Sequence, residues 1–334
     1  MSKILKAILI LLAAGLLVPA LFMAWSGHGA QTSGHDCQEL IIFHAGSLAV
    51  PFKQICEEFG RHYPNVKIIR EAAGSRTCAR KITDLGRPCD VIASADYTVI
   101  DTLLIPEFAE WNIKFASNEM VIAFRKDSCG ANRINETNWY NILLEKDVTF
   151  GRSDPNADPC GYRAVLAIRL AEKFYDRPGL ARGILAKDHR YIRPKEVDLL
   201  ALLEADELDY IFTYHSVAQQ HKLEILLLPD EINLKKAELA DSYRTASVRI
   251  TGKRPGTFIN KVGEPILYGI TVPKDAPNRQ TALTFLTFLL DVEKGGPILE
   301  KNGHSLMVPS PTTTFEKLPG CLRIFALPTE EGKR

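Results

Sequence analysis

The sequence predicts an α/β protein with two lobes, each built on a sheet covered by helices. Short apolar stretches typical of strands alternate with stretches typical of helices along most of the chain. Connections of this length indicate parallel strands joined by crossover helices. A chain of 334 residues is also long for a single hydrophobic core, so two lobes are expected.

In the first half of the chain, "LIIF" at residues 40–43 is apolar and rich in β-branched residues, which predicts a buried strand. The following stretch, "VPFKQICEEFGRHYP", reads as a helix at residues 50–64. Similar patterns predict strands at residues 66–69, 90–95, 120–126 and 148–151, and helices from about Arg76, at 138–145 and at 162–175.

In the second half, an amphipathic to fully apolar helix is predicted at residues 195–206 and a strand at residues 208–215. A further strand is predicted at residues 265–273, followed by one long helix at residues 279–299. The tail from Ser310 is rich in Pro and Thr and is expected to be peripheral.

The N-terminus predicts export from the cytoplasm. Lys3 and Lys6 precede an uncharged apolar run of 19 residues from Ala7 to Trp25, longer than most signal-peptide cores and just long enough to span a bilayer. Residues 1–30 are therefore interpreted as a signal peptide or an N-terminal membrane anchor. The remainder is expected to be extracytoplasmic, in the periplasm or on the outer face of the cell membrane.

Composition argues against some classes of partner and site. A net charge of +1 argues against a nucleic-acid partner, so any anion specificity must be local. The seven cysteines show no CxxC or CxxH spacing, which argues against a zinc site. One or more disulfides are expected in an oxidising compartment, although an odd number leaves at least one cysteine unpaired.

Two predicted strand-to-helix corners are alike. Ala45-Gly46-Ser47 and Ala73-Gly74-Ser75 each follow a strand, with the two serines 28 residues apart. Small residues let the backbone approach a ligand, and each serine is expected at or near a helix N-cap. Free amides at a helix start attract an anion without a formal cation. The corners therefore predict a small-anion site, with ordinary helix capping as the alternative.

Several motifs occur in an order that resembles a known family. They are "FHAGSL", "EAAGS", "KITDLG", "DVIASADYTVI", "DPCGYR", "ELDYIFTYHSVAQQH" and "PILYGITVPK". The chain resembles the tungstate/molybdate-binding proteins of ABC importers, of the archaeal-type ModA/WtpA family. The resemblance implies a type II periplasmic-binding-protein fold with a ligand cleft between two α/β lobes.

The resemblance also implies how the chain is divided. The first lobe is expected at roughly residues 37–120 plus 268–334, and the second at 121–267. The strands at residues 120–126 and 265–273 are expected to cross between the lobes as paired hinge strands. The implied partner is an ABC transporter permease with its ATPase, and the protein is expected to act as a monomer without enzymatic activity or a cofactor.

The resemblance also implies roles for individual site residues. Ser47 and Ser75 match serines that donate to oxyanion oxygens, with the amide of Ala45 or Gly46 assisting. Asp158 and Glu196 match carboxylates that bind the metal directly, and a different alignment would substitute Glu204 or Glu207 for Glu196. Tyr214 matches a tyrosine at the site, expected as a hydrogen-bond donor.

Two carboxylates facing a dianion would repel sulfate, and burying them unpaired would cost several kcal/mol. Molybdenum(VI) and tungsten(VI) can instead accept hard carboxylate oxygens and expand from four oxygen ligands to six. The Asp158 and Glu196 pair is therefore expected to favour molybdate or tungstate and to exclude sulfate.

Three alternatives remain open at this point. A hydrolase could use His44, Ser47 and Asp158, although "HAGSLA" is not a G-x-S-x-G elbow. A membrane-anchored anion sensor would retain the apolar N-terminus. A binding protein for sulfate, phosphate or ferric ion would share the fold, but paired tyrosines are typical of ferric sites and only Tyr214 is well placed.

Overall fold

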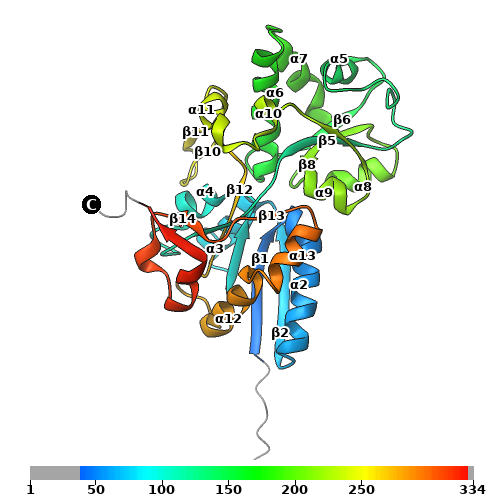
Figure 1. The fold of residues 1–334 in the computed structure, drawn as a ribbon. Helices are drawn as coiled ribbons and strands as arrows, with labels where there is room; N and C mark the ends of the chain where they lie inside the picture. Colours follow the sequence, from blue (N-terminus) through cyan, green and yellow to red (C-terminus); the bar gives the residue numbers. More distant parts are fainter. Residues whose placement is uncertain (1–37, 330–334) are drawn as a thin grey trace, which may run out of the picture. The chain divides into compact units, whose positions relative to one another are not determined.

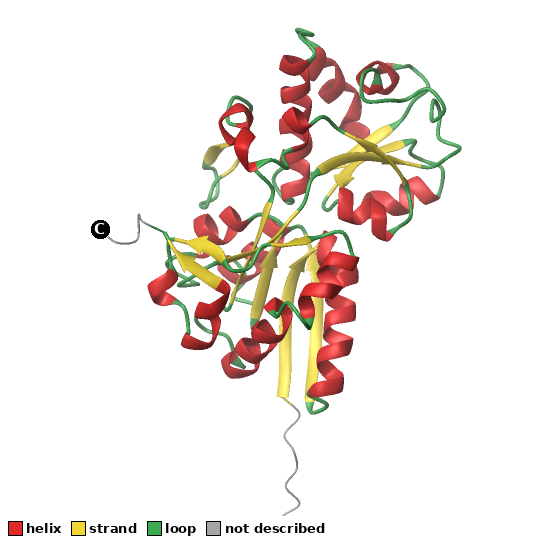
Figure 2. Cartoon of the chain, viewed as in Figure 1, coloured by secondary structure: helices red, strands yellow, loops and turns green. Residues whose placement is uncertain are grey.

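The computed structural model describes residues 38–329 of the chain (Figure 1). The predicted signal peptide or anchor at residues 1–30 and Cys37 lie outside the described residues. Within the described part, no helix combines the length and the apolar character needed to cross a membrane. Helices and strands alternate around two main sheets, one of six strands and one of five (Figure 2).

The six-stranded sheet has the order β13-β4-β12-β3-β1-β2. Its strands are β1 (Gln38–Ala45), β2 (Val66–Ala73), β3 (Val91–Ser94), β4 (Ile113–Ser117), β12 (Leu267–Thr271) and β13 (Ser305–Leu306). β1 pairs in parallel with β2 and β3, whereas β12 is antiparallel to β3 and β4. The prediction of parallel sheets was therefore wrong for part of this sheet, because it assumed a crossover helix between strands. β12 is preceded instead by the hairpin at residues 247–262.

Strand β1 is covered by helices on both faces, as its continuous apolar sequence predicts. Leu40 and Ile42 belong to the cluster that includes residues of α2 (Ala49–His62) and α12 (Arg279–Leu290). Phe43 belongs to the opposite cluster, which includes residues of α3 (Ser75–Thr83). Because side chains of β1 alternate between these two clusters, the register of β1 in the sheet is fixed, and with it the position of the first Ala-Gly-Ser corner.

The five-stranded sheet has the order β7-β6-β8-β5-β9. Its strands are β5 (Met120–Phe124), β6 (Phe150–Ser153), β7 (Ile192–Arg193), β8 (Tyr210–Tyr214) and β9 (Glu224–Leu227). β5 is antiparallel to β8 and β9, and β6 is parallel to β7 and β8, so this sheet is also mixed. Figure 1 shows α6 (Pro159–Phe174) on one side and α8 (Asp198–Glu204) with α9 (His215–Gln220) on the other.

The expected pairing of the two crossing strands was wrong. β5 belongs to the five-stranded sheet and β12 to the six-stranded sheet, so each is paired within its own sheet. The chain passes between the sheets through short segments beside these strands, where the amide of Asn118 donates to the carbonyl of Ile266 at 3.4 Å. The lobe boundaries 37–120 plus 268–334 and 121–267 stay a prediction.

The predicted helix at residues 279–299 is two helices, α12 and α13 (Gly295–Lys301). The chain turns at Asp291, whose Oδ1 accepts from the amide of Glu293 at 2.8 Å. A Cβ on Gly295 would lie 2.1 Å from the carbonyl oxygen of Leu289, so only glycine permits this return of the chain. The break was missed because the apolar residues on either side of it, such as Leu290 and Ile298, resemble one continuous helical pattern.

The remaining elements are short. They are α4 (Tyr97–Val99), a π-helical turn (Ile100–Leu104), α5 (Trp139–Leu144), α7 (Leu180–Lys187), α10 (Asp230–Asn233), α11 (Ala240–Tyr243), the hairpin β10 (Ser247–Thr251) with β11 (Phe258–Val262), and the pair β14 (Ser310–Thr312) with β15 (Ala326–Pro328). Several 3-10 turns complete them: Gly46–Leu48, Asp188–Tyr191, Ala237–Leu239, Phe315–Lys317 and Gly320–Phe325.

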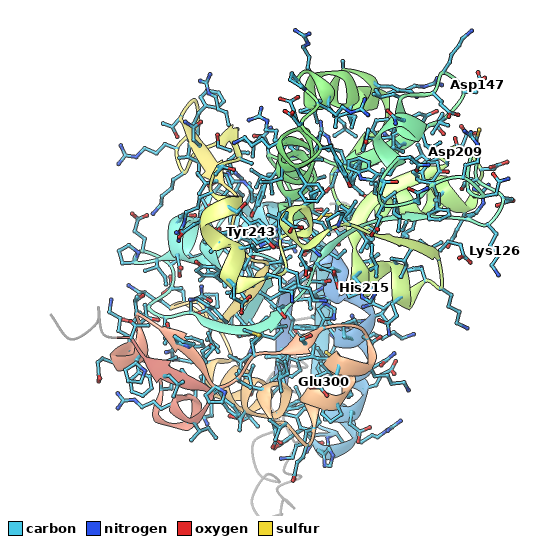
Figure 3. The ribbon with its side chains drawn as sticks, turned by 45° about the horizontal axis from the view of Figure 1, so that its top comes forward. Lys126, Asp147, Asp209, His215, Tyr243 and Glu300 are labelled. Atoms are coloured by element: carbon cyan, nitrogen blue, oxygen red, sulfur yellow. The ribbon has the colours of Figure 1, made fainter. Side chains whose placement is uncertain are left out.

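Charged side chains such as Lys126 and Asp147 point outward (Figure 3). Within the described part, the six cysteines at positions 56, 78, 89, 129, 160 and 321 are all free thiols, so the expected disulfides do not form among them.

Candidate functional site

The first Ala-Gly-Ser corner presents Ser47 in the interior. β1 ends at Ala45, a 3-10 turn follows, and α2 begins with Leu48 as its N-cap. Ser47 is fully buried, and its Oγ lies 2.9 Å from the Tyr268 hydroxyl. Ser47 thus lies next to the N-cap, as predicted, but its hydroxyl makes no capping hydrogen bond and contacts a distant strand instead.

The second corner brings Ser75 against the start of α6. Gly74 is the N-cap of α3, and the buried Ser75 Oγ accepts from the amide of Ala95 at 2.9 Å. A Cβ on Gly74 would lie 2.4 Å from the carbonyl oxygen of Ala157, so glycine is needed for this approach. The amide of Thr77 also donates to that carbonyl at 3.3 Å. The corner therefore lies directly beside Asp158.

Asp158 holds the start of α6 and the backbone of Glu196 together. It is the N-cap of α6, and its Oδ1 accepts from the amide of Cys160 at 3.2 Å. Its Oδ2 accepts from the amide of Glu196 at 3.0 Å. Each carboxylate oxygen has two lone pairs, so both oxygens retain one for a ligand. Asp158 is buried, which makes a purely solvated role impossible.

Glu196 places a buried carboxylate at the first corner. Its side chain is 1% exposed, and neither Oε has a hydrogen-bond partner among the described residues. A Cβ on Gly46 would lie 3.0 Å from one Oε and 3.2 Å from the other. Glu204 and Glu207, the two alternatives, are exposed. The structure thus brings Glu196 together with Asp158 and the Gly46-Ser47 turn.

The electrostatics of Glu196 are unfavourable as they stand. Burial, and next the neighbouring Asp158 carboxylate, raise the pKa of Glu196 well above its ordinary value. Buried polar groups without partners are rare in folded proteins because they lose their hydration without replacement. A carboxylate in this state has lone pairs to donate, so a ligand that accepts them would remove this unfavourable situation.

This pKa shift predicts a pH dependence of the unliganded protein. The folded pKa of Glu196 is raised above its unfolded value of 4.5, so its contribution to stability is fully present below pH 4.5 and is lost as pH rises. As pH rises, the free energy of unfolding of Glu196→Gln should therefore increase relative to that of the wild type, by at most about 1.4 kcal/mol per pH unit. Denaturant unfolding of both proteins at several pH values measures this difference.

The difference in unfolding free energy between the variant and the wild type does not depend on titrating groups that both proteins share. Burial lowers the pKa of His44 and of His304 from 6.5 to about 4, so these two residues give the opposite slope. Because both proteins contain them, their contributions cancel. Parallel stability curves would contradict the raised pKa of Glu196.

Tyr214 ends β8 and is fully buried. Its hydroxyl oxygen accepts from Arg163 Nη1 at 2.8 Å, and a guanidinium has no acceptor, so the phenol proton remains available for another group. Arg163 is itself held by the carbonyl of Ala95 at 2.6 Å and by Asp96 at 3.7 Å. Burial raises the pKa of Tyr214, which keeps its phenol protonated.

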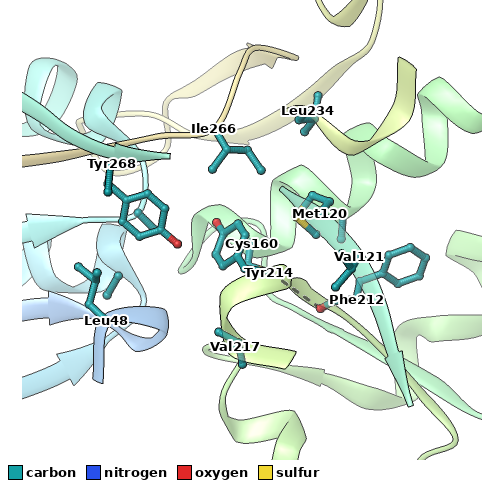
Figure 4. Packing of buried hydrophobic residues seen from close by; sticks show 14 of the residues in the cluster. Leu48, Met120, Val121, Cys160, Phe212, Tyr214, Val217, Leu234, Ile266 and Tyr268 are labelled. Carbon is teal, nitrogen blue, oxygen red and sulfur yellow. Dashed lines mark hydrogen bonds between the residues drawn. The ribbon is translucent and has the colours of Figure 1, made fainter. Parts of the chain in front are cut away.

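Tyr268 was not predicted as a site residue. It is the second residue of β12, and its ring centroid lies 6.0 Å from that of Tyr214. Figure 4 shows the two rings side by side with their hydroxyl groups turned toward one another. The signal in the sequence is one tyrosine in the otherwise aliphatic run "PILYGITVP", which was interpreted only as a crossing strand.

The hydrolase arrangement is not formed. His44 Nδ1 lies 2.8 Å from the carbonyl oxygen of Ala45, and the Ser47 hydroxyl is bonded to Tyr268 rather than to an imidazole. Among the described residues, no group of three or more His, Cys, Asp or Glu side chains could hold a bare metal ion. Buried hydroxyls with two buried carboxylates suit an oxyanion whose central atom accepts further oxygen ligands.

Comparisons with known proteins identify relatives of this chain. The family described as "Bacterial extracellular solute-binding protein" matches residues 40–305. An uncharacterized solute-binding protein of Petrotoga mobilis is 51% identical, covering 86% of this chain and 89% of the relative. The molybdate/tungstate-binding protein WtpA of Pyrococcus abyssi is 44% identical, covering 89% and 92%.

Solved structures show the same fold. The periplasmic molybdate-binding protein of Azotobacter vinelandii matches with a TM-score of 0.56 at 14% identity, covering 80% of this chain and 99% of that one. The sulfate-binding protein SubI of Mycobacterium tuberculosis matches with a TM-score of 0.59 at 12% identity, covering 87% and 92%. The predicted two-lobed type II periplasmic-binding-protein fold is thereby confirmed.

Proposed function

Because this chain belongs to the bacterial extracellular solute-binding proteins, we propose that it captures molybdate or tungstate and delivers it to an ABC importer. Its similarity to the WtpA proteins of Pyrococcus abyssi and Thermococcus kodakarensis, which bind these two anions, supports the proposal. The relatives are solute-binding proteins and not enzymes, so the chain has no catalytic role.

The buried, unpartnered carboxylate of Glu196 is the observation that carries the proposal. Its two oxygens lie against the Gly46-Ser47 turn, and Asp158 accepts from the Glu196 backbone. Repulsion between these acids and a dianion excludes an ordinary oxyanion, whereas a molybdenum(VI) or tungsten(VI) centre accepts both carboxylates as ligands. Asp158 and Glu196 would then complete a six-coordinate centre.

Three hydroxyls would bind the oxygens of the anion. Ser75 Oγ already accepts from Ala95, and Tyr214 Oη already accepts from Arg163, so each has its proton free to donate. Ser47 would be the third donor, assisted by backbone amides of its turn. Donors surround the oxygens while carboxylates approach the metal, and this division distinguishes the anion from sulfate.

The cellular setting follows from the same family. The protein would act outside the cytoplasm and hold the anion between two lobes bounded near residues 120 and 268. It would do so as a monomer that docks on a permease with its ATPase. Retention of residues 1–30 as a membrane anchor would tether it beside that permease, and cleavage would release it. N-terminal sequencing of the mature protein distinguishes these two forms.

Thermal unfolding with three anions tests the proposed ligand. Molybdate or tungstate at about 1,000 times its Kd should stabilise the purified full chain by roughly 4 kcal/mol, which raises the Tm by roughly 6 °C for a chain of this length. Millimolar sulfate should leave the Tm unchanged at matched ionic strength. Equal shifts from all three anions would contradict metal ligation and favour a general oxyanion site.

A further inference from the structure

Asn118 lies in the short segment between β4 and β5, and its side-chain amide has a defined orientation. Its Oδ1 accepts from the backbone amides of Glu119 at 2.9 Å and Ser216 at 3.4 Å. Backbone amides can only donate, so the oxygen and nitrogen of this side chain cannot be exchanged. Asn118 Nδ2 therefore faces the other way, where it donates to Ser216 Oγ at 2.7 Å and Tyr268 Oη at 3.1 Å.

The hydroxyl of Tyr268 connects the Asn118 amide to Ser47. Burial raises the pKa of Tyr268, so its phenol keeps its single proton at neutral pH. Its oxygen receives the N–H of Asn118, and the other partner it has among the described residues is Ser47 Oγ at 2.9 Å. Ser47 Oγ is thus the acceptor within hydrogen-bond distance to which the phenol can donate its proton.

We propose that Asn118 and Tyr268 are positioning residues that make the Ser47 hydroxyl a donor to the bound anion. Once Ser47 accepts from Tyr268, its own proton is directed toward the site formed with Glu196. This inference rests on the proposed function and narrows its substrate. The substrate oxygen at Ser47 must be an acceptor without a proton, so the site selects a fully deprotonated oxyanion at that position.

The chain of donors also links the binding site to the connection between the sheets. Asn118 contacts Ser216 at the start of α9, Tyr268 belongs to β12, and Ser47 follows β1. β1 and β12 belong to the six-stranded sheet, whereas α9 directly follows β8 of the five-stranded sheet. The Ser47 proton is therefore oriented only when the connecting segment holds Asn118 against both β12 and α9. A simple packing role for Tyr268 would require none of this directionality.

A double-mutant cycle measured by titration calorimetry with sodium molybdate tests the proposal. The variants of the full chain are Tyr268→Phe, Ser47→Ala and the double variant. Tyr268→Phe should weaken binding by up to about tenfold, the usual effect of losing one hydrogen bond between neutral groups. The double variant should bind like Ser47→Ala alone, because the phenol acts only through the serine.

Tyr175→Phe is the matched control. The Tyr175 hydroxyl likewise accepts an N–H, from Trp139 Nε1 at 3.2 Å, and donates to the carbonyl of Glu136. Loss of this hydroxyl should leave the Kd for molybdate unchanged. If Tyr268→Phe does not fold, Asn118→Ala replaces it in the same double-mutant cycle, because this variant removes the N–H that donates to Tyr268 without adding charge.

The outcomes separate this proposal from the proposed function. Equal weakening by Tyr268→Phe with and without the Ser47 hydroxyl, or no weakening at all, would overturn the positioning role in a chain that binds molybdate. Failure of the unaltered chain to bind molybdate or tungstate would contradict the proposed function, and this proposal with it.

Discussion

Replacing Glu196 by Gln is expected to weaken tungstate binding by at least about a hundredfold, equivalent to about 2.7 kcal/mol. A neutral amide is a poor ligand for a hexavalent metal, so the loss falls on the bound state. The unliganded protein should be at least as stable at pH 7, because the variant no longer has to bury a carboxylate without a partner. Calorimetry and denaturant unfolding of the same samples measure the two effects.

Glu58→Gln controls for the general loss of one negative charge. Glu58 lies on α2 and forms a pair with Arg61 at the surface, where such pairs contribute little. Its replacement should leave both binding and stability nearly unchanged. If Glu196→Gln kept wild-type affinity, Glu196 would not be a ligand of the metal.

Replacing Asp158 by Ala is expected to reduce tungstate binding by a similar factor, with an additional loss of stability. Asp158 caps α6 through Cys160, and removal of such a cap costs about 1 kcal/mol. The amide of Glu196 would also lose its acceptor. Binding should therefore decrease far more than unliganded stability does, as measured by calorimetry and by denaturant unfolding.

Asp158→Ser separates the two roles of this residue. Serine is a good N-cap, so the variant should recover the stability that Ala loses, while it lacks the carboxylate that binds the metal. Recovery of affinity together with stability would show that Asp158 acts through α6 alone.

The sequence predicted much of the fold because local patterns determine local structure. The strands that end at Ala45 and Ala73 were recognised from apolar stretches at residues 40–43 and 66–69, and both Ala-Gly-Ser corners do contain buried serines. Strand direction and partner could not be predicted in this way. β12 lies antiparallel between β3 and β4, which depends on packing between segments far apart in the chain.

The site was predictable only in part for the same reason. Ser47, Ser75, Asp158 and Glu196 were predicted from the family resemblance. The sequence did not reveal that Glu196 lacks a partner or that its carboxylate lies against Gly46. Tyr268 was missed because its contact with Ser47 joins residues 221 positions apart. Such contacts arise from the tertiary fold, and no local pattern records them.

The direct involvement of the acidic pair is tested most directly by X-ray absorption at the tungsten edge of the tungstate complex. Ligation by Asp158 and Glu196 predicts a six-coordinate spectrum that reverts toward four-coordinate in Glu196→Gln. A tetrahedral spectrum in the unaltered chain, identical to that of free tungstate, would show that the carboxylates do not reach the metal.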